Sequence, residues 1–315
     1  MKKIYYSIAD YNNDEIKNVK KVLAENSMNL VNGKNVKTFE SKTSKFFGKK
    51  FGLMVNSGSS ANLLALASLN IKKGSEVITP SLTFSTTVSP ILQCNLVPVF
   101  VDIEKNKYLA DANKIESLIT KKTKAIMIPN LLGNIADWRK INKISKKYNL
   151  YVIEDSADTI GYKINKKIVG NCSDIVTSSF YASHIITAAG YGGIACFNDK
   201  KLYEKAKIIR AWGRQSAILH NPEKSKKRFS YKINNISYDA SYYFTELGYN
   251  FLPTEMSAAF GLAQLKKLNQ RISKRKNNFN LYCDYFKKNL NQYIDLPIQQ
   301  KGTSSAWLAF PIIIN

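Results

Sequence analysis

The sequence predicts an α/β protein in which helices cover both faces of a mostly parallel sheet, followed by a smaller and incomplete α/β domain. Short apolar runs alternate with helical patterns between residues 51 and 197, which is typical of such sheets. The 315 residues are enough for one large or two modest domains. The hydrophobic fraction of 44% and the charged fraction of 22% are those of a globular protein.

The expected strands are apolar runs bounded by polar or small residues. They lie at 51–55, 76–79, 97–102, 124–128, 151–155, 174–179 and 193–197. Helical patterns fill most of the gaps, at 59–69, 84–93, 112–119 and 135–148, and an amphipathic helix with Ile16, Val19 and Leu23 precedes them. Because ligands of such sheets bind at the C-terminal ends of the strands, we expect the site at that edge.

The chain changes character after the last expected strand. Residues 215–245 are polar and aromatic and predict a long connecting excursion outside the core. One long helix is expected over about 254–292, and 307–315 resembles a strand that stops just after it starts. We therefore expect a large domain at 1–250 and the start of an incomplete small C-terminal domain at 251–315.

The formal net charge is +24, from 47 Lys and Arg against 23 Asp and Glu. Nucleic-acid recognition needs clustered cations, whereas these are mostly lysines spread along the whole chain. A solvated basic surface explains the composition better, and its positive field favours an anionic small substrate. We expect no nucleic-acid partner.

The four cysteines, Cys94, Cys172, Cys196 and Cys283, are far apart and form no CxxC pair. This spacing indicates neither a disulfide framework nor a metal site. The N-terminus has no apolar segment after its two lysines, and no stretch approaches the length of a membrane span. The sequence thus predicts a cytoplasmic protein with buried thiols and no membrane partner.

Residues 56–61, NSGSSA, join an expected strand to an expected helix. Gly58 allows a ligand to approach the backbone closely, and the free N–H groups of a helix N-terminus attract an anion. A plain helix cap formed by these serines would look the same. No GxxxxGK[ST] accompanies the segment, which argues against a P-loop.

Asp155 and His184 are the two residues best suited to chemistry. Asp155 ends the run YVIED at the edge of the expected sheet. A carboxylate at this position can be a metal ligand, a structural cap or the anionic partner of a protonated cofactor nitrogen. His184 is one of two histidines and lies in a loop of small residues that leads into AAGYGG. These neighbours favour a functional histidine over a structural one.

Nine blocks of the sequence resemble, in the same order, the DegT/StrS family of sugar aminotransferases and dehydratases. They are NSGSSANLLAL, EVITPSLTFSTTV, VPVFVDIE, TKAIMIPNLLGN, YVIEDSADTIG, SSFYASHIIT, GYGGIACF, RAWGR and ELGYNFLPTEMSAAFGLAQL. The resemblance starts at about residue 30 and runs to the end of the chain. It implies the fold of type I proteins that depend on pyridoxal phosphate (PLP).

The resemblance also implies which residues hold the cofactor phosphate. Gly58, Ser59 and Ser179 match phosphate-binding positions. Asn250, in the block GYN, matches a residue that reaches the phosphate of the neighbouring subunit. This implies a homodimer with shared active sites.

Three further positions correspond to residues around the cofactor ring. Phe84 matches an aromatic residue that stacks on the pyridine ring, and Asp155 matches the carboxylate that pairs with the ring nitrogen. Asp158 falls near the ring hydroxyl, where the family usually has Gln or Glu.

At residue 184 the sequence departs from the aminotransferases, which have the lysine that binds PLP covalently. With a histidine at this position, the sequence instead resembles the subgroup of nucleotide-linked 4-keto-6-deoxyhexose 3-dehydratases. The resemblance implies that the pyridoxamine form (PMP) condenses with the 4-keto group and that His184 takes a proton from C4′ while the C3 hydroxyl leaves. The pKa of an unperturbed imidazole, about 6.5, suits this proton transfer at neutral pH.

The segment after RAWGR limits the choice within this subgroup. CDP-sugar dehydratases of the ascarylose type carry a cysteine cluster there for an iron–sulfur centre, whereas 211–245 contains no cysteine. We therefore expect no iron–sulfur cluster and a reaction closer to the GDP-sugar, colitose-type branch, in deoxysugar synthesis for surface polysaccharide such as lipopolysaccharide. The sequence leaves open whether the nucleotide is CDP, GDP, dTDP or UDP, and which sugar stereoisomer reacts. The alternatives are an aminotransferase-like enzyme on the same scaffold, or a non-catalytic homologue that binds cofactor or sugar nucleotide.

Overall fold

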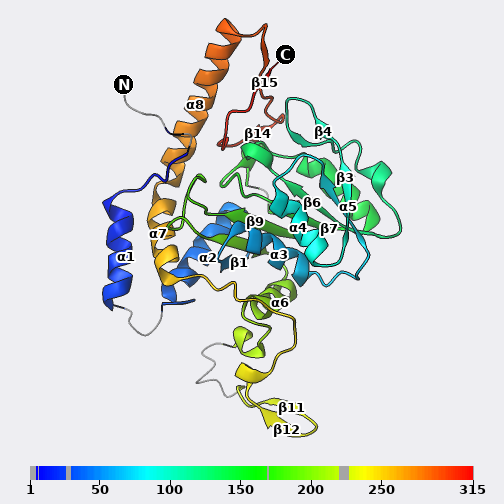
Figure 1. Cartoon of the computed structure of the whole chain (residues 1–315), viewed down its shortest axis with the longest axis vertical. Coiled ribbons are helices and arrows are strands. Elements are labelled where there is room, and N and C mark those ends of the chain that lie inside the picture. The colour runs from blue at the N-terminus through cyan, green and yellow to red at the C-terminus, as the bar shows by residue number, and fades with distance from the viewer. Residues whose placement is uncertain (1–4, 6, 26–29, 169, 220–226, 315) are drawn as a thin grey trace.

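The computed structural model describes residues 5, 7–25, 30–168, 170–219 and 227–314. A seven-stranded sheet lies at its centre, in the order β1-β10-β9-β7-β6-β2-β3 (Figure 1). Its strands are β1 Phe51–Val55, β2 Glu76–Pro80, β3 Val97–Val101, β6 Thr123–Pro129, β7 Tyr151–Asp155, β9 Ile175–Ser179 and β10 Gly193–Phe197. Strand β10 runs antiparallel to β1 and β9, and the other neighbours are parallel. The predicted sheet and its strands are confirmed.

Helices cover both faces of this sheet, as predicted. One face carries α3 Gly58–Ser68, α4 Ser85–Gln93 and α6 Lys200–Arg210, and the other carries α2 Lys34–Phe46, α5 Trp138–Tyr148 and α7 Glu255–Lys266. Strand β1 shows the cause, because its side chains alternate between the two layers. Leu53 and Val55 belong to the apolar cluster of α3 and α6, whereas Met54 belongs to that of α2 and α7.

The prediction of a single helix over about 254–292 is wrong, because the structure has two helices there. They are α7 and α8 Leu268–Asn289, which meet at Lys267. The Lys267 ammonium binds the carboxylates of Glu15 at 2.9 Å and Asp14 at 3.1 Å, both on α1 Asn13–Glu25. These ion pairs with α1, which is far away in the sequence, hold Lys267 at the junction between α7 and α8. Helix α1 is the amphipathic helix that was expected, although it buries Glu15 and Val22 and leaves Ile16 and Leu23 exposed.

The helix expected over 112–119 is also wrong. Only a short 3₁₀ helix forms there, η1 Glu116–Leu118. The Asp111 carboxylate accepts a hydrogen bond from the backbone N–H of Asn113 at 2.9 Å. Such a local turn offers the backbone an alternative to helical hydrogen bonds.

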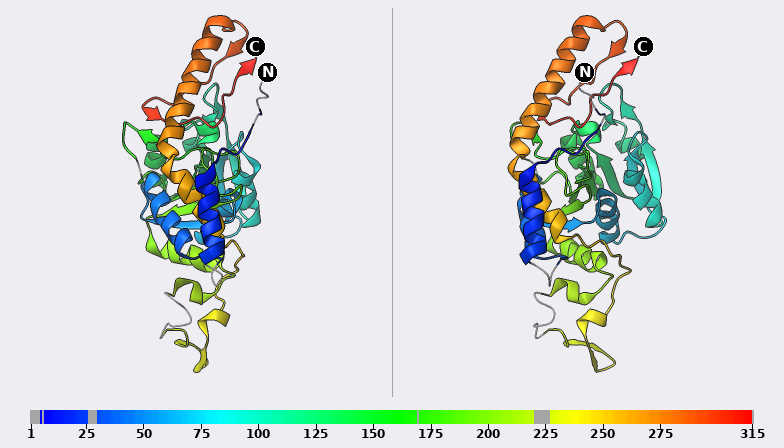
Figure 2. Two further views of the ribbon diagram at one scale, coloured as in Figure 1. Left: turned by 90° about the vertical axis from the view of Figure 1, so that its left-hand side faces the viewer. Right: turned by 60° about the vertical axis from the view of Figure 1, so that its left-hand side comes forward.

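Residues 211–219 and 227–250 project from the sheet as an arm, at the opposite end of the molecule from α8 (Figures 1 and 2). Residues 220–226 of the expected excursion lie outside the described residues. The elements of the arm are η3 Gln215–Ile218, the hairpin strands β11 Tyr231–Ile233 and β12 Ile236–Tyr238, and η5 Ala240–Tyr242. The predicted excursion outside the core is thus confirmed.

The remaining elements are short. They are the paired strands β4 Ile103–Glu104 and β5 Leu109–Ala110, β8 Lys163–Ile164 and β14 Thr303–Ser304, β13 Ile294–Asp295 and β15 Ile313–Ile314, and the 3₁₀ helix η2 Leu131–Gly133. Strand β15 is the one expected near the end of the sequence. Within the described residues, no helix has the length and apolar character needed to cross a membrane.

Candidate active site

The candidate residues converge on one edge of the sheet, where β1, β7 and β9 end. Asp155 is the last residue of β7 and Ser179 is the last residue of β9. Gly193, the first residue of β10, is paired with both Val55 and Ser179. The expected site edge therefore brings the turn after β1 next to the ends of β7 and β9.

The turn from β1 into α3 forms a cradle of backbone groups. Ser57 is the N-cap of α3, and its hydroxyl accepts a hydrogen bond from the Ser60 N–H at 3.0 Å. A Cβ added at Gly58 would lie 2.6 Å from the Ser179 Cβ, and one added at Gly193 would lie 2.2 Å from the Ser57 carbonyl oxygen. Both positions therefore require glycine. The helix N-terminus, with Ser59 exposed, is a suitable site for a phosphate.

Asp155 is a buried carboxylate held by neutral donors. Its Oδ2 accepts hydrogen bonds from Asn62 Nδ2 and Thr87 Oγ1, each at 2.8 Å, and its Oδ1 accepts the Ala157 N–H at 3.0 Å. Burial raises the pKa of Asp155, against the lowering effect of these hydrogen bonds. No described residue forms an ion pair with it within 4.0 Å. A cation at this position, such as a protonated ring nitrogen, would stabilise the charge.

The loop after β2 contributes an exposed aromatic ring. Phe84 precedes α4, and 69% of its surface is exposed. Thr83 Oγ1 and Asn56 Oδ1 are buried atoms near this edge without a hydrogen-bond partner among the described residues. A glycine cradle, a buried carboxylate, an exposed ring and unsatisfied polar atoms together fit PLP or PMP.

His184 and Asp158 lie beside each other in the loops that follow β9 and β7. His184 Nδ1 is 4.0 Å from Asp158 Oδ1, and the two side chains are 15% and 20% exposed. Burial, with the charge of Arg275 adding to it, lowers the pKa of His184 to about 4. Burial raises the pKa of Asp158 to about 6. The imidazole is therefore neutral at neutral pH, and the ordinary pKa expected for it from the sequence is wrong because of its burial.

Asn250 lies apart from these residues, at the base of the arm. Its side chain is exposed, and its Oδ1 accepts the Leu252 N–H at 3.4 Å. The next residue, Phe251, accepts the backbone N–H of Asn56 at 3.1 Å. Asn250 is thus next in the chain to a residue that contacts the turn after β1, and its side chain is exposed.

Two residues of the site were not among the sequence-predicted ones, Asn62 and Thr87. Asn62 is a buried polar residue in the otherwise apolar helix α3, and it also accepts a hydrogen bond from the Thr177 hydroxyl. A polar side chain on the buried face of such a helix is the signal that could have identified it.

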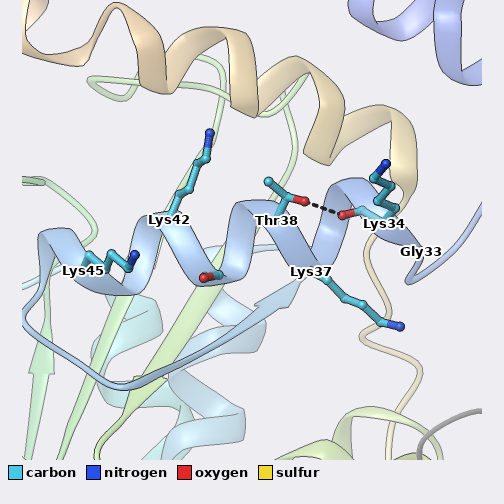
Figure 3. Close-up of a pocket in the computed structure, with 7 residues that line it drawn as sticks. Gly33, Lys34, Lys37, Thr38, Lys42 and Lys45 are labelled. Carbon is cyan, nitrogen blue, oxygen red and sulfur yellow. Dashed lines mark hydrogen bonds between the residues drawn. The ribbon is translucent and has the colours of Figure 1, made fainter.

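A hollow of about 600 Å³ lies along α2 and contains none of these residues. Its lining residues are Gly33, Lys34, Lys37, Thr38, Ser41, Lys42 and Lys45 (Figure 3). The lysines lie on the outer face of α2, whose inner face buries Val36 and Phe39. Among the residues described here, no group of three His, Cys, Asp or Glu side chains is arranged to hold a metal ion.

Comparison with known proteins places this geometry in a family. The chain matches the DegT/DnrJ/EryC1/StrS aminotransferase family over residues 9–315. It is 37% identical over 297 residues to the lipopolysaccharide biosynthesis protein RfbH of Salmonella typhimurium, covering 91% of this chain and 68% of that protein. It is 36% identical over 311 residues to the GDP-4-keto-6-deoxy-D-mannose 3-dehydratase of Yersinia pseudotuberculosis, covering 96% and 75%.

A solved structure agrees with this relationship. The GDP-4-keto-6-deoxy-D-mannose-3-dehydratase of E. coli with bound hydrated PLP has a TM-score of 0.87 and 34% identity, covering all of this chain and 80% of the other. The predicted fold is that of these PLP-dependent proteins. The chain therefore belongs to the DegT/DnrJ/EryC1/StrS aminotransferase family.

Proposed function

We propose that the protein removes the C3 hydroxyl of a GDP-linked 4-keto-6-deoxyhexose, with PMP and PLP as its cofactor forms. The observation that carries this proposal is the imidazole of His184 in the loop after β9, where the family's aminotransferases have the lysine that binds PLP covalently. An imidazole transfers protons but cannot form that bond. The exchange favours elimination over a cycle of amino transfer.

The residues at the sheet edge would hold the cofactor in one orientation. Gly58, Ser59 and Ser179 would bind the phosphate at the N-terminus of α3, Phe84 would cover the ring, and Asp155 would face the ring nitrogen. When bound, the protonated ring supplies an electron sink for charge that develops beside the sugar's keto carbon. Asp155 favours that protonated form because it is a buried carboxylate without a protein cation beside it.

His184 would accept the proton of the cofactor's C4′ position while the C3–O bond of the sugar breaks. Because its pKa is lowered to about 4, the imidazole keeps an unprotonated nitrogen at neutral pH. The hydrogen bond from its backbone N–H to the Tyr181 carbonyl, at 3.1 Å, holds the turn that carries it. A positioned base of this kind contributes about 10²- to 10⁴-fold to a rate.

Several of the dehydratase relatives support a GDP-linked substrate, although one, from Saccharopolyspora spinosa and 35% identical, is named for a dTDP-linked sugar. The dehydratase of E. coli O55:H7 with the same name as the Yersinia protein is 38% identical over 290 residues. A structure of GDP-4-keto-6-deoxymannose-3-dehydratase with bound GDP-perosamine has a TM-score of 0.85 and 34% identity. The net charge of +24 also favours an anionic sugar nucleotide.

Three further parts of the proposal concern the setting of the reaction. We infer a cytoplasmic homodimer that makes deoxysugar for surface polysaccharide, with 1–250 as the cofactor domain and 251–315 as the start of the small domain. The arm supports the dimer, because Tyr242, Phe244 and Leu247 are 72%, 52% and 94% exposed beside Asn250. Apolar surface of this kind typically meets another protein.

The test is an assay of the PMP-loaded protein with GDP-4-keto-6-deoxymannose, followed by mass spectrometry and proton NMR of the sugar. The proposal expects a sugar that has a methylene at C3 in place of the hydroxyl, and no such product when PMP is omitted. A 4-amino sugar would instead indicate amino transfer, as in GDP-perosamine synthase of E. coli O157:H7, which is 34% identical over 269 residues. An unchanged sugar would contradict both reactions.

A further inference from the structure

We propose that Asp158 is a positioning residue that keeps the proton of the neutral His184 ring on Nδ1 and leaves Nε2 free to accept a proton. This inference rests on the proposed role of His184 as the base. It concerns the protein's own side chains, so it can be tested without substrate.

The tautomer of His184 decides whether the ring can act as a base. A neutral imidazole carries one proton, on either nitrogen, and the partner of one nitrogen sets the state of the other. His184 Nδ1 is buried and has no hydrogen-bond partner within the described residues. The carboxylate oxygen Oδ1 of Asp158, 4.0 Å away, faces it. This distance is longer than a hydrogen bond, and such contacts often tighten when the ligand binds.

A hydrogen bond to the second carboxylate oxygen of Asp158, Oδ2, holds the side chain in this orientation. Its Oδ2 accepts the backbone N–H of Leu132 at 2.8 Å. Leu132 has a φ of 58°, and its carbonyl in turn accepts the Leu308 N–H at 2.8 Å. The neighbouring Gly133 allows this close approach, because a Cβ there would lie 2.7 Å from the Leu308 nitrogen. With Oδ2 engaged, Oδ1 is left for the imidazole.

The contacts of Asp158 favour this role over the one that the resemblance implies, a position near the ring hydroxyl of the cofactor. Both oxygens of Asp158 face protein groups, the Leu132 N–H and the His184 ring. The effect of Asp158 on the reaction would therefore pass through His184.

The surrounding charges set the pH at which the pair works. The Asp155 carboxylate adds to the effect of burial in raising the pKa of Asp158 to about 6. On the imidazole side, Arg275 of α8 disfavours a second proton on the ring, and the Tyr181 ring lies edge-on with its centroid 6.4 Å away. Above about pH 6, an ionised Asp158 faces a neutral imidazole, which is the state that retains the proton on Nδ1.

The direct test is ¹⁵N NMR of histidine-labelled protein without cofactor, at a pH well above the pKa of Asp158. The chain has only two histidines, His184 and His220, so a His184→Asn sample assigns the signals. We expect the Nδ1–H tautomer for His184, and a shift toward Nε2–H in Asp158→Asn, because the amide NH₂ can donate to Nδ1. The matched control Asp102→Asn removes an exposed carboxylate elsewhere and should leave the tautomer unchanged.

A second readout is the pH profile of turnover. The rate of the parental protein should fall as the pH drops through about 6, which gives its pH profile an acid limb. Asp158→Asn should be slower by at least about tenfold, and its profile should lack this limb. Asp158→Glu should regain part of the rate and the limb. An Nε2–H tautomer in the parental protein, or a tautomer that Asp158→Asn leaves unchanged, would overturn the inference. Either result would leave the dehydration itself standing.

Discussion

His184 and Asp155 illustrate how single residues set the chemistry through burial. Both are largely shielded from water, and burial disfavours the charged form of each, lowering the pKa of the imidazole and raising that of the carboxylate. The result is a neutral imidazole, suited to the base role proposed for it, and a buried carboxylate that a cation would stabilise.

The first prediction concerns His184→Ala. This change removes the proton acceptor while the cradle and Asp155 remain, so turnover should fall by about 10²- to 10⁴-fold with little change in the dissociation constant of PMP. Single-turnover kinetics and a cofactor titration measure the two quantities. A folded, PMP-loaded variant that reacts at the parental rate would exclude His184 as the base.

At this scale the sequence predicts some residues of the site and misses others. Asp155 is identifiable because it ends an apolar run, and His184 because it stands among small residues. Asn62 and Thr87 contact Asp155 from 93 and 68 residues away in the chain. No local pattern encodes such a contact, which exists only once the sheet has brought α3 and α4 together.

Among the elements, α3 connects the fold most directly with the site. Its N-terminus begins at Gly58, the glycine that lies against Ser179 of β9. The strand that precedes it and the serine cap were both predictable from local sequence. The two wrong helix predictions failed for reasons that hydrophobic periodicity does not contain. A turn at Asp111 replaces the helix expected over 112–119. Lys267, bound to Glu15 of a helix far away in the sequence, lies where the helix expected over 254–292 is broken.

The second prediction therefore concerns Gly58→Ala. The new Cβ would lie 2.6 Å from the Ser179 Cβ, so the turn must shift and the cradle should lose affinity for phosphate. We expect the dissociation constant of PMP to rise by at least about tenfold, the equivalent of about 1.4 kcal/mol. Fluorescence titration of the cofactor measures this, and thermal unfolding checks the fold. Parental affinity in a folded variant would argue against phosphate binding at this helix.

For the whole molecule, the arm and α8 are the parts whose placement the sequence predicts least. The polar and aromatic composition of 215–245 indicates that the segment leaves the core, and its described residues, 215–219 and 227–245, do so. The two ends of the arm are held together at its base by backbone contacts between residues far apart in the chain, such as the hydrogen bond from the Trp212 N–H to the Tyr249 carbonyl at 3.0 Å.

The third prediction is a dependence of stability on pH. The folded-state pKa of Asp158 is raised from 3.8 to about 6, so the folded protein binds a proton in that window that the unfolded chain has released. The contribution of Asp158 to the free energy of unfolding should therefore fall as the pH rises through the window, by roughly 3 kcal/mol. The lowered pKa of His184 acts in the opposite direction in both proteins, so the comparison is made with a variant. Asp158→Asn lacks the contribution of Asp158. Its stability relative to the parental protein, from urea unfolding without cofactor, should therefore rise between about pH 4 and about pH 7 and then level off. A constant difference would contradict the raised pKa.

The fourth prediction tests sites shared between subunits. Asn250→Ala and Asp155→Ala should each be inactive alone, because one would remove a contact to the partner's phosphate and the other the partner of the ring nitrogen. When the two are co-expressed, mixed dimers rebuild one intact site and should recover part of the activity, measured on tag-selected heterodimers. An absence of recovery with both variants folded would contradict sharing.

The measurement that tests the central claim most directly is the product made by His184→Lys beside the parental protein, with the same keto sugar. If the imidazole selects elimination, the parental protein should release only the sugar without its C3 hydroxyl, and its polypeptide mass should be unchanged by borohydride after loading with PLP. The lysine variant should retain PLP covalently after borohydride and shift its product toward the 4-amino sugar. A parental protein that holds PLP covalently, or the same product from both proteins, would contradict the account.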